Sequence, residues 1–237
     1  MNDEIQTVIQ SLVKNEFDVR YAENSDAARQ IILDMIPDGG VVGVGDSVTV
    51  RQLGVFEALQ QRGTPVINPW ASEEKPLTWA EVFDMIRKTR DSDVFLTGSN
   101  AVTRDGKIVN TDMTGNRVSA MIYGVPLVIL AIGRNKITKD VAQALDRLKN
   151  IVAPEHCQTK ARKTPCAVTG RCTDCNSAQR ICRVTTIMEK RPFQTDIKVV
   201  MIDQDLGLSW NPDWDRDRIE AIKRNYKALT RPRRLPD

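Results

Sequence analysis

Apolar runs that alternate with helical patterns constrain the fold of this chain more than any other feature of its sequence. The runs are VVGVG (41–45), DVFLTG (93–98), PLVILAIG (126–133) and DIKVVMI (196–202), and each has the length of a buried strand. Segments with helical periodicity lie between them, the clearest being ITKDVAQALDRLKNIV (137–152). Strands that alternate with helices predict the α/β class with a Rossmann-like parallel sheet.

Local signals mark the ends of several elements. Ser25 precedes the helical pattern of residues 26–36 and is the expected N-cap of that helix, and Thr78 is the expected N-cap of a helix over 79–90. Asp105-Gly106 between extended flanks predicts a small hairpin over residues 101–110.

The length of 237 residues suits one large α/β domain with an appendage. We expect the α/β domain over 1–210, a cysteine-rich insertion within it over 153–185, and a charged helix with a basic tail over 211–237. The formal charge of +3 is too small to indicate nucleic-acid binding. The sequence shows no signal peptide and no membrane-spanning run, so we expect a cytoplasmic protein, in which disulfides are rare.

Small and polar residues follow three of the predicted strands. Because ligands bind outside the carboxyl ends of parallel strands, these residues predict a pocket for a carboxylate or a phosphate. Glycine and serine also end strands in α/β proteins that bind nothing there, and this alternative stays open. The candidate ligand-binding residues at these ends are Gly43, Gly45, Asp46, Ser47, Thr49, Gly98, Ser99, Asn100 and Asn135.

A second polar cluster occurs in DGKIVNTDMTGNR (105–117). Its candidate ligand-binding residues are Asp105, Asn110, Asn116 and Arg117, since an arginine beside a helix N-terminus can bind a carboxylate through two hydrogen bonds. A turn between a hairpin and a helix collects the same residue types without any ligand, so both readings remain.

Four of the five cysteines lie within 17 residues, in TPCAVTGRCTDCNSAQRIC (164–182). Clustered thiols in a turn-rich, basic segment of a protein without a secretory signal predict a metal site on Cys166, Cys172, Cys175 and Cys182. Only Cys172 and Cys175 form a CxxC pair, and the other gaps match neither a ferredoxin run nor a two-pair zinc ribbon, so spacing does not choose between a tetrahedral zinc ion and an iron–sulfur cluster. The single histidine, His156, and the neighbouring Cys157 are left outside this set.

Three blocks of sequence together resemble the LUD domain family, the lactate-utilisation proteins once described as a domain of unknown function. They are VVGVGDSVTVRQLG, LTGSNAVTRDGKIVNTDMTGNRVSAMIYG and KTPCAVTGRCTDCNSAQRIC, and the third is similar to the branch that carries a cysteine segment. The resemblance covers residues from about 4 to 210. Relatives tend to have asparagine and arginine where this chain has His156 and Thr159, which indicates a different specificity if that strip contacts a ligand.

The resemblance implies a Rossmann-like fold related to the superfamily of ribose-phosphate isomerase and the CoA-transferases. Some relatives are encoded with iron–sulfur proteins that oxidise lactate to pyruvate, but no defined reaction follows from membership of this branch. The favoured hypothesis is a redox component that binds a small carboxylate, carries an iron–sulfur cluster of the four-iron type, and serves the oxidation of lactate or a related 2-hydroxy acid. The expected partners are other iron–sulfur or flavin redox proteins, with no nucleic acid and no membrane span.

Two alternatives remain open. The first is an isomerase or CoA-transferase-like enzyme with a structural zinc. The argument against it is that no glutamate or lysine stands out as the nucleophile or base that such a reaction requires. The second is a non-catalytic ligand sensor or assembly protein that uses Lys160, Arg162 and Lys163 to dock an acidic partner. Whether the chain is an enzyme is not decided by its sequence.

Overall fold

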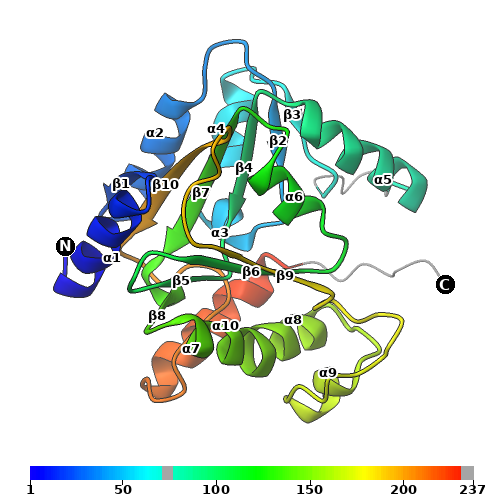
Figure 1. Ribbon diagram of the computed structural model, residues 1–237. Coiled ribbons are helices and arrows are strands. Elements are labelled where there is room, and N and C mark those ends of the chain that lie inside the picture. The colour runs from blue at the N-terminus through cyan, green and yellow to red at the C-terminus, as the bar shows by residue number, and fades with distance from the viewer. Residues whose placement is uncertain (71–76, 231–237) are drawn as a thin grey trace.

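The computed structural model describes residues 1–70 and 77–230, so the arginines of the predicted basic tail lie outside the described residues. A six-stranded sheet forms its centre, in the order β1-β10-β7-β4-β2-β3, and every pair of neighbours is parallel (Figure 1). The α/β, Rossmann-like fold predicted from the sequence is therefore confirmed. The six strands are β1 (Asp18–Ala22), β2 (Val42–Val44), β3 (Val66–Ile67), β4 (Val94–Gly98), β7 (Leu127–Gly133) and β10 (Asp196–Ile202).

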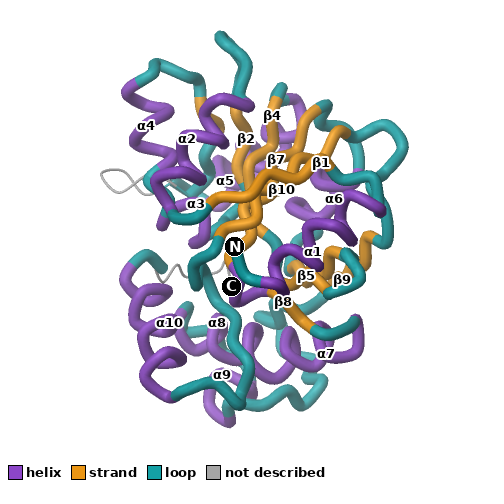
Figure 2. The backbone as a smooth tube through the Cα atoms, turned by 90° about the vertical axis from the view of Figure 1, so that its left-hand side faces the viewer, coloured by secondary structure: helices purple, strands orange, loops and turns teal. Residues whose placement is uncertain are grey.

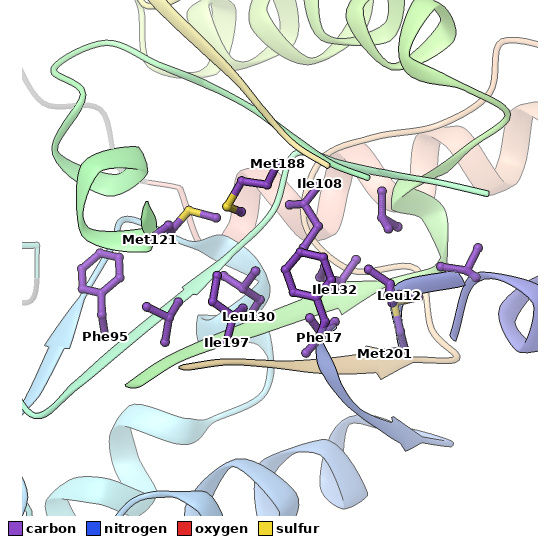
Figure 3. Close-up of a cluster of buried hydrophobic side chains, with 14 of the residues drawn as sticks. Leu12, Phe17, Phe95, Ile108, Met121, Leu130, Ile132, Met188, Ile197 and Met201 are labelled. Carbon is purple, nitrogen blue, oxygen red and sulfur yellow. The ribbon is translucent and has the colours of Figure 1, made fainter. Parts of the chain in front are cut away.

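Helices cover both faces of this sheet (Figure 2). On one face, α2 (Ser25–Met35), α3 (Val48–Gln52) and α4 (Val55–Gln61) bury a cluster of aliphatic side chains against β2, β4, β7 and β10. On the other face, α1 (Asp3–Lys14) and α6 (Asn116–Ile122) enclose a second cluster, whose members include Phe95, Leu130 and Ile197 (Figure 3). Burial on both faces explains why the strands read as continuous apolar runs.

A smaller, mixed sheet packs over the second cluster. Its strands are β5 (Ala101–Thr103), β6 (Ile108–Asp112), β8 (Ile137–Thr138) and β9 (Val184–Met188), in the order β8-β5-β6-β9. Strands β5 and β6 are antiparallel, which confirms the predicted hairpin at Asp105-Gly106. Ile108 and Met188 point from this sheet toward the main sheet (Figure 3). The sequence did not predict β8 or β9.

Of the two predicted helix caps, one is confirmed and the other is wrong. Thr78 caps α5 (Trp79–Lys88) in a capping box with Glu81, as expected. The cap of α2 is Asn24 rather than Ser25, because the Asn24 side chain accepts a hydrogen bond from Ala27 N at 2.9 Å. The prediction missed by one residue since asparagine and serine are both good caps. A short 3-10 helix, η1 (Thr89–Asp91), follows α5.

Helical segments at the carboxyl end of the main sheet come from three parts of the chain (Figures 1 and 2). After the 3-10 turn η2 (Arg134–Lys136), α7 (Val141–Arg147) continues through the π-helical stretch η3 (Leu148–Val152) into α8 (Ala153–Thr159), and α9 (Pro165–Thr169) follows. Helix α10 (Arg216–Ala228) buries Ile222 and Tyr226 against Val48 and Val152. Within the described ranges, no helix combines the length and apolar character needed to cross a membrane.

Candidate functional site

A cavity of about 1150 Å³ lies at the carboxyl edge of the main sheet, where β2, β4 and β7 end. Parallel strands bring the residues that follow them to one edge, so segments far apart in the sequence meet here. Most of the ligand-binding residues predicted from the sequence contribute to its walls. They are Asp46, Ser47, Thr49, Gly98, Ser99, Asn100, Asn116 and Arg117.

Three of the predicted glycines have different local surroundings. Gly98 lies in the cavity wall, and a Cβ atom there would come within 2.7 Å of the Ser47 hydroxyl, so the absence of a side chain makes room for that hydroxyl. A Cβ at Gly43 would lie 2.6 Å from Ser92 Oγ, and one at Gly45 would lie 2.5 Å from Thr97 Oγ1. Gly43 and Gly45 are not among the described residues that line the cavity. These contacts show that close packing requires both glycines, Gly43 against the η1 turn and Gly45 against β4.

Asp105, Asn110 and Asn135 also lie outside the cavity lining. Asp105 sits in the hairpin turn, where it accepts a short hydrogen bond from the Thr103 hydroxyl. Asn135 is fully buried; its amide donates to Ser209 O, and its Oδ1 accepts from Leu206 N, both at 2.9 Å. Asn135 thus fixes the loop after β10.

Arg117 is the central support of the cavity wall formed by β4, β6 and α6. Its N–H donors are directed at five protein groups, which leaves the cavity a positive charge but no free pair of donors for a carboxylate. Asn110 is the buried acceptor that holds it in place. The acceptors are Asn110 Oδ1 (2.7 Å), Thr111 O (2.8 Å), Asn100 Oδ1 (3.0 Å), Gly98 O (3.1 Å) and the Asp112 carboxylate (3.4 Å).

A second charged group lies around Asp46, which follows β2. Its carboxylate contacts Arg51 at 2.6 Å and Lys160 at 3.5 Å. Burial acts to raise the pKa of Asp46, but the positive charges of Lys160 and Arg51 outweigh it and hold the pKa below its usual value. The Lys160 side chain is only 10% exposed, and Lys160 and Arg162 both line the cavity. These two residues therefore face the cavity, which does not suit the docking role considered for them above.

His156 and Tyr226 form a pair that the sequence did not mark as functional. The His156 Nδ1 atom is hydrogen-bonded to the Tyr226 hydroxyl, and both residues line the cavity. Burial, followed by the charge of Lys160, lowers the pKa of His156 to about 4, so the ring is neutral at pH 7. Val152, His156 and Lys160 are spaced four residues apart, which places them on one face of the helix.

Lys136 is a second functional residue that the sequence analysis passed over. It follows β7 in η2, is 4% exposed, and donates a hydrogen bond from Nζ to Leu208 O at 2.6 Å. Burial, followed by the charges of Arg147 and Arg117, lowers the pKa of Lys136 to about 7. Its position directly after an apolar strand was a usable signal, since that is where side chains enter the carboxyl-edge pocket.

A model of the LUD domain matches residues 5–202 of this chain, a span that includes the main sheet and most of the cavity wall. The chain belongs to the LUD domain family. A solved structure of a DUF162 family protein from Deinococcus radiodurans is similar to it, at 13% sequence identity and a TM-score of 0.46 over 84% of this chain and 96% of that one. No curated protein matches it.

The two positions at which the sequence analysis expects this LUD domain protein to differ from its relatives have different surroundings. His156 is part of the cavity wall, whereas Thr159 is not among the described residues that line it. That this strip contacts a ligand stays a prediction.

The cysteine segment forms another part of the cavity wall, through Ala178, Gln179 and Ile181. Its four predicted metal ligands, Cys166, Cys172, Cys175 and Cys182, are half-buried and form no disulfide.

Cys157 is buried beneath this segment, and burial, together with the nearby Cys166 and Cys182 thiols, raises its pKa to about 12. Across the described residues, no three or more Cys, His, Asp or Glu side chains are arranged to hold a metal ion. As they lie, the four thiols do not fit a zinc ion or an iron–sulfur cluster, and metal binding by them stays a prediction from the sequence.

Proposed function

We propose that this LUD domain protein binds a small anion, a carboxylate or a phosphate, in the cavity at the carboxyl edge of its main sheet. The observation that carries this proposal is the excess of positive charge among the described residues of the wall. Three carboxylates, Asp46, Glu57 and Asp112, stand against four cationic side chains and the amine of Lys136, and two of the three carboxylates are already paired with cations. The cations are Arg51, Arg117, Lys160 and Arg162.

The donors available to such an anion differ along the wall. The Arg117 donors are occupied by protein acceptors, so Arg117 acts through its charge. Lys160 has one recorded contact, at 3.5 Å to Asp46, and an ammonium group carries three donors. We expect Lys160 to bind the anion directly, with the Ser47 hydroxyl as a second contact.

We further propose that the ligand is lactate or a related 2-hydroxy acid and that the protein serves its oxidation. Family membership supports this proposal, as does the position of the cysteine segment in the wall of the same cavity. An iron–sulfur cluster on the four cysteines is the expected redox group, and its binding requires the segment to close around it.

A phosphate ester is the alternative ligand. The cavity is as large as the pockets that hold drug-sized molecules, so it has room for more than lactate. Lys136 now supplies the buried lysine whose absence spoke against an isomerase or CoA-transferase-like enzyme. In that alternative, a zinc ion on the cysteines has a structural role.

Calorimetric titration of the purified protein with lactate, pyruvate, phosphate and ribose 5-phosphate tests anion binding. We expect binding by at least one of these that Lys160→Gln weakens and that Lys139→Gln, a change at an exposed lysine outside the cavity lining, leaves unchanged. Failure of all four to bind, or equal effects of the two substitutions, contradicts the proposal.

Iron, sulfide and zinc content and the visible spectrum of protein prepared without oxygen test the redox proposal. Iron with sulfide, lost in both Cys172→Ser and Cys175→Ser, supports it. One zinc and no colour favours the alternative, and folded protein with neither metal refutes metal binding by these cysteines.

A further inference from the structure

Lys136 stands out because its amine is buried without a counter-ion. It makes no ion pair with a carboxylate within residues 1–70 and 77–230, and its one recorded hydrogen bond goes to the Leu208 carbonyl. A buried ammonium group without a partner is costly, so such lysines lose their proton or are retained for a function. Lys136 is also one of the residues that line the cavity in which we propose that an anion binds.

The surroundings of this amine include a hydroxyl at close range. A Cβ atom built on Gly207 would lie 2.4 Å from Thr49 Oγ1 and 3.2 Å from Lys136 Nζ, so both atoms border the same small volume above that glycine. Gly207 has a φ of +66°, and its N–H donates to Gln52 Oε1 at 2.6 Å, which fixes this stretch of backbone. The amine and the hydroxyl thus both border Gly207 at the cavity wall.

The backbone that carries Lys136 is fixed on both sides. Arg147 donates to the carbonyls of Asn135 at 3.2 Å and Ile137 at 2.9 Å. The Asn135 side chain in turn holds the 206–209 loop, which provides the carbonyl that Lys136 contacts. Arg147 is therefore a positioning residue for the amine, and its charge also lowers the pKa of Lys136. A lysine held in this way has few side-chain conformations to lose when a ligand binds.

We propose that Lys136 forms an imine with the carbonyl carbon of an oxo compound whose carboxylate or phosphate is held by the cations of the same cavity. The nitrogen lone pair attacks the carbonyl carbon and a C–N bond forms. The carbonyl oxygen gains two protons, both originating from the amine, and leaves as water, so amine and carbonyl give imine and water without any oxidant or reductant. The Thr49 hydroxyl is placed to donate a hydrogen bond to that oxygen.

This inference rests on the anion binding proposed above and names its substrate class. A carbonyl and an acid group occur in one molecule in 2-oxo acids and in keto or aldehyde phosphates. The amine can attack the carbonyl of either class, because with its pKa of about 7 it is largely unprotonated and nucleophilic just above neutral pH.

Reductive trapping tests the proposal on the unmodified protein. The protein is incubated near pH 7.5 with pyruvate, glyoxylate, glyceraldehyde 3-phosphate or ribose 5-phosphate, each with cyanoborohydride, and the site of any adduct is mapped by mass spectrometry. We expect one adduct, on Lys136, from the 2-oxo acids or from the phosphates, and this difference identifies the ligand source. Lys136→Arg is expected to abolish it, and Lys139→Arg at the exposed lysine nearby to leave it unchanged.

Two outcomes overturn the imine: no adduct on Lys136 with any of the four compounds, or adducts spread over the exposed lysines. Lactate and inorganic phosphate, which have no carbonyl, separate this failure from failure of the proposed function. If lactate or phosphate binds and none of the four carbonyl compounds is trapped, anion binding is supported and the imine proposal is refuted. If neither they nor the four compounds bind and none is trapped, both proposals fall. Lys136→Met is a second variant, whose folding is checked by circular dichroism. The adduct must be lost in it as well.

Discussion

Replacing Lys136 with methionine removes a buried amine and leaves the volume of the side chain nearly unchanged. Burial lowers the pKa of this lysine from its ordinary 10.5 to about 7. Folding at neutral pH therefore buries an amine that is protonated in the unfolded chain, and this costs stability. A methionine has no such preference and packs well in irregular space. We therefore expect Lys136→Met to stabilise the protein although it removes a hydrogen bond.

The magnitude follows from the pKa. A drop from 10.5 to about 7 corresponds to roughly 5 kcal/mol of folding free energy at neutral pH. Removing the amine also leaves the Leu208 carbonyl without its donor at 2.6 Å, which costs about 1–3 kcal/mol. The expected net gain at pH 7 is about 2–4 kcal/mol, larger than most single substitutions achieve.

The gain must also depend on pH in a defined direction. Between pH 7 and 10.5, the unfolded chain holds a proton on this lysine that the folded protein does not, so the free energy of unfolding of the wild type rises with pH. The slope is up to about 1.4 kcal/mol per pH unit. The variant lacks this contribution, so its advantage shrinks as pH increases and reverses between about pH 8.5 and 10, where the remaining penalty of the buried amine equals the loss of the hydrogen bond.

Urea unfolding followed by circular dichroism, with a reductant for the thiols, measures both quantities at pH 7, 8.5 and 9.5. Lys139→Met is the matched control, because Lys139 is exposed and a surface change is expected to stay within about 0.5 kcal/mol. A destabilised Lys136→Met at pH 7, or a gain that does not change with pH, refutes the reasoning.

Two further substitutions test the cavity wall. His156→Asn should flatten the acid side of the stability profile. In the wild type, the unfolded chain binds a proton between pH 6.5 and about 4 that the folded protein excludes, which removes about 3 kcal/mol of stability as the pH falls. Equal acid slopes in urea unfolding would contradict this assignment. Arg117→Lys should lower the free energy of unfolding by about 3–5 kcal/mol, since one ammonium group cannot satisfy the acceptors on Asn100, Asn110 and their neighbours. A loss below about 1 kcal/mol would show that these acceptors find other donors.

The centre of the main sheet could be predicted because β2, β4, β7 and β10 lie in apolar runs that are buried on both faces. The smaller sheet could be predicted only in part. Asp105-Gly106 marks the β5–β6 hairpin, whereas β8 has two residues and β9 exposes Val184 and Ile187 instead of alternating clearly. Strands of this kind take their conformation from their neighbours in the sheet, and their own side chains carry little signal.

The same distinction applies to the site. Asp46, Ser47 and Asn100 follow strands of one parallel sheet, so the rule for carboxyl edges was sufficient to group them. His156 and Tyr226 reach the cavity from α8 and α10, and only the packing of these helices places them there. Their approach is a property of tertiary structure, which spacing along the chain does not encode.

Helix α10 follows all strands of the main sheet in the described chain, so it is synthesised after them, and this affects how the cavity forms. Tyr226 and Leu229 line a cavity whose other lining residues come earlier in the chain, from Asp46 onward. The Leu229 carbonyl accepts a hydrogen bond from the Arg51 guanidinium at 3.4 Å. While the ribosome is still adding this last helix, the sheet can already form, because domains fold from the N-terminal side during translation. Until α10 docks, however, Val48 and Val152 lack the helix against which they pack, and His156 lacks its tyrosine partner. The newly made protein therefore passes through a stage in which one wall of the cavity, with the apolar side chains behind it, is open to solvent.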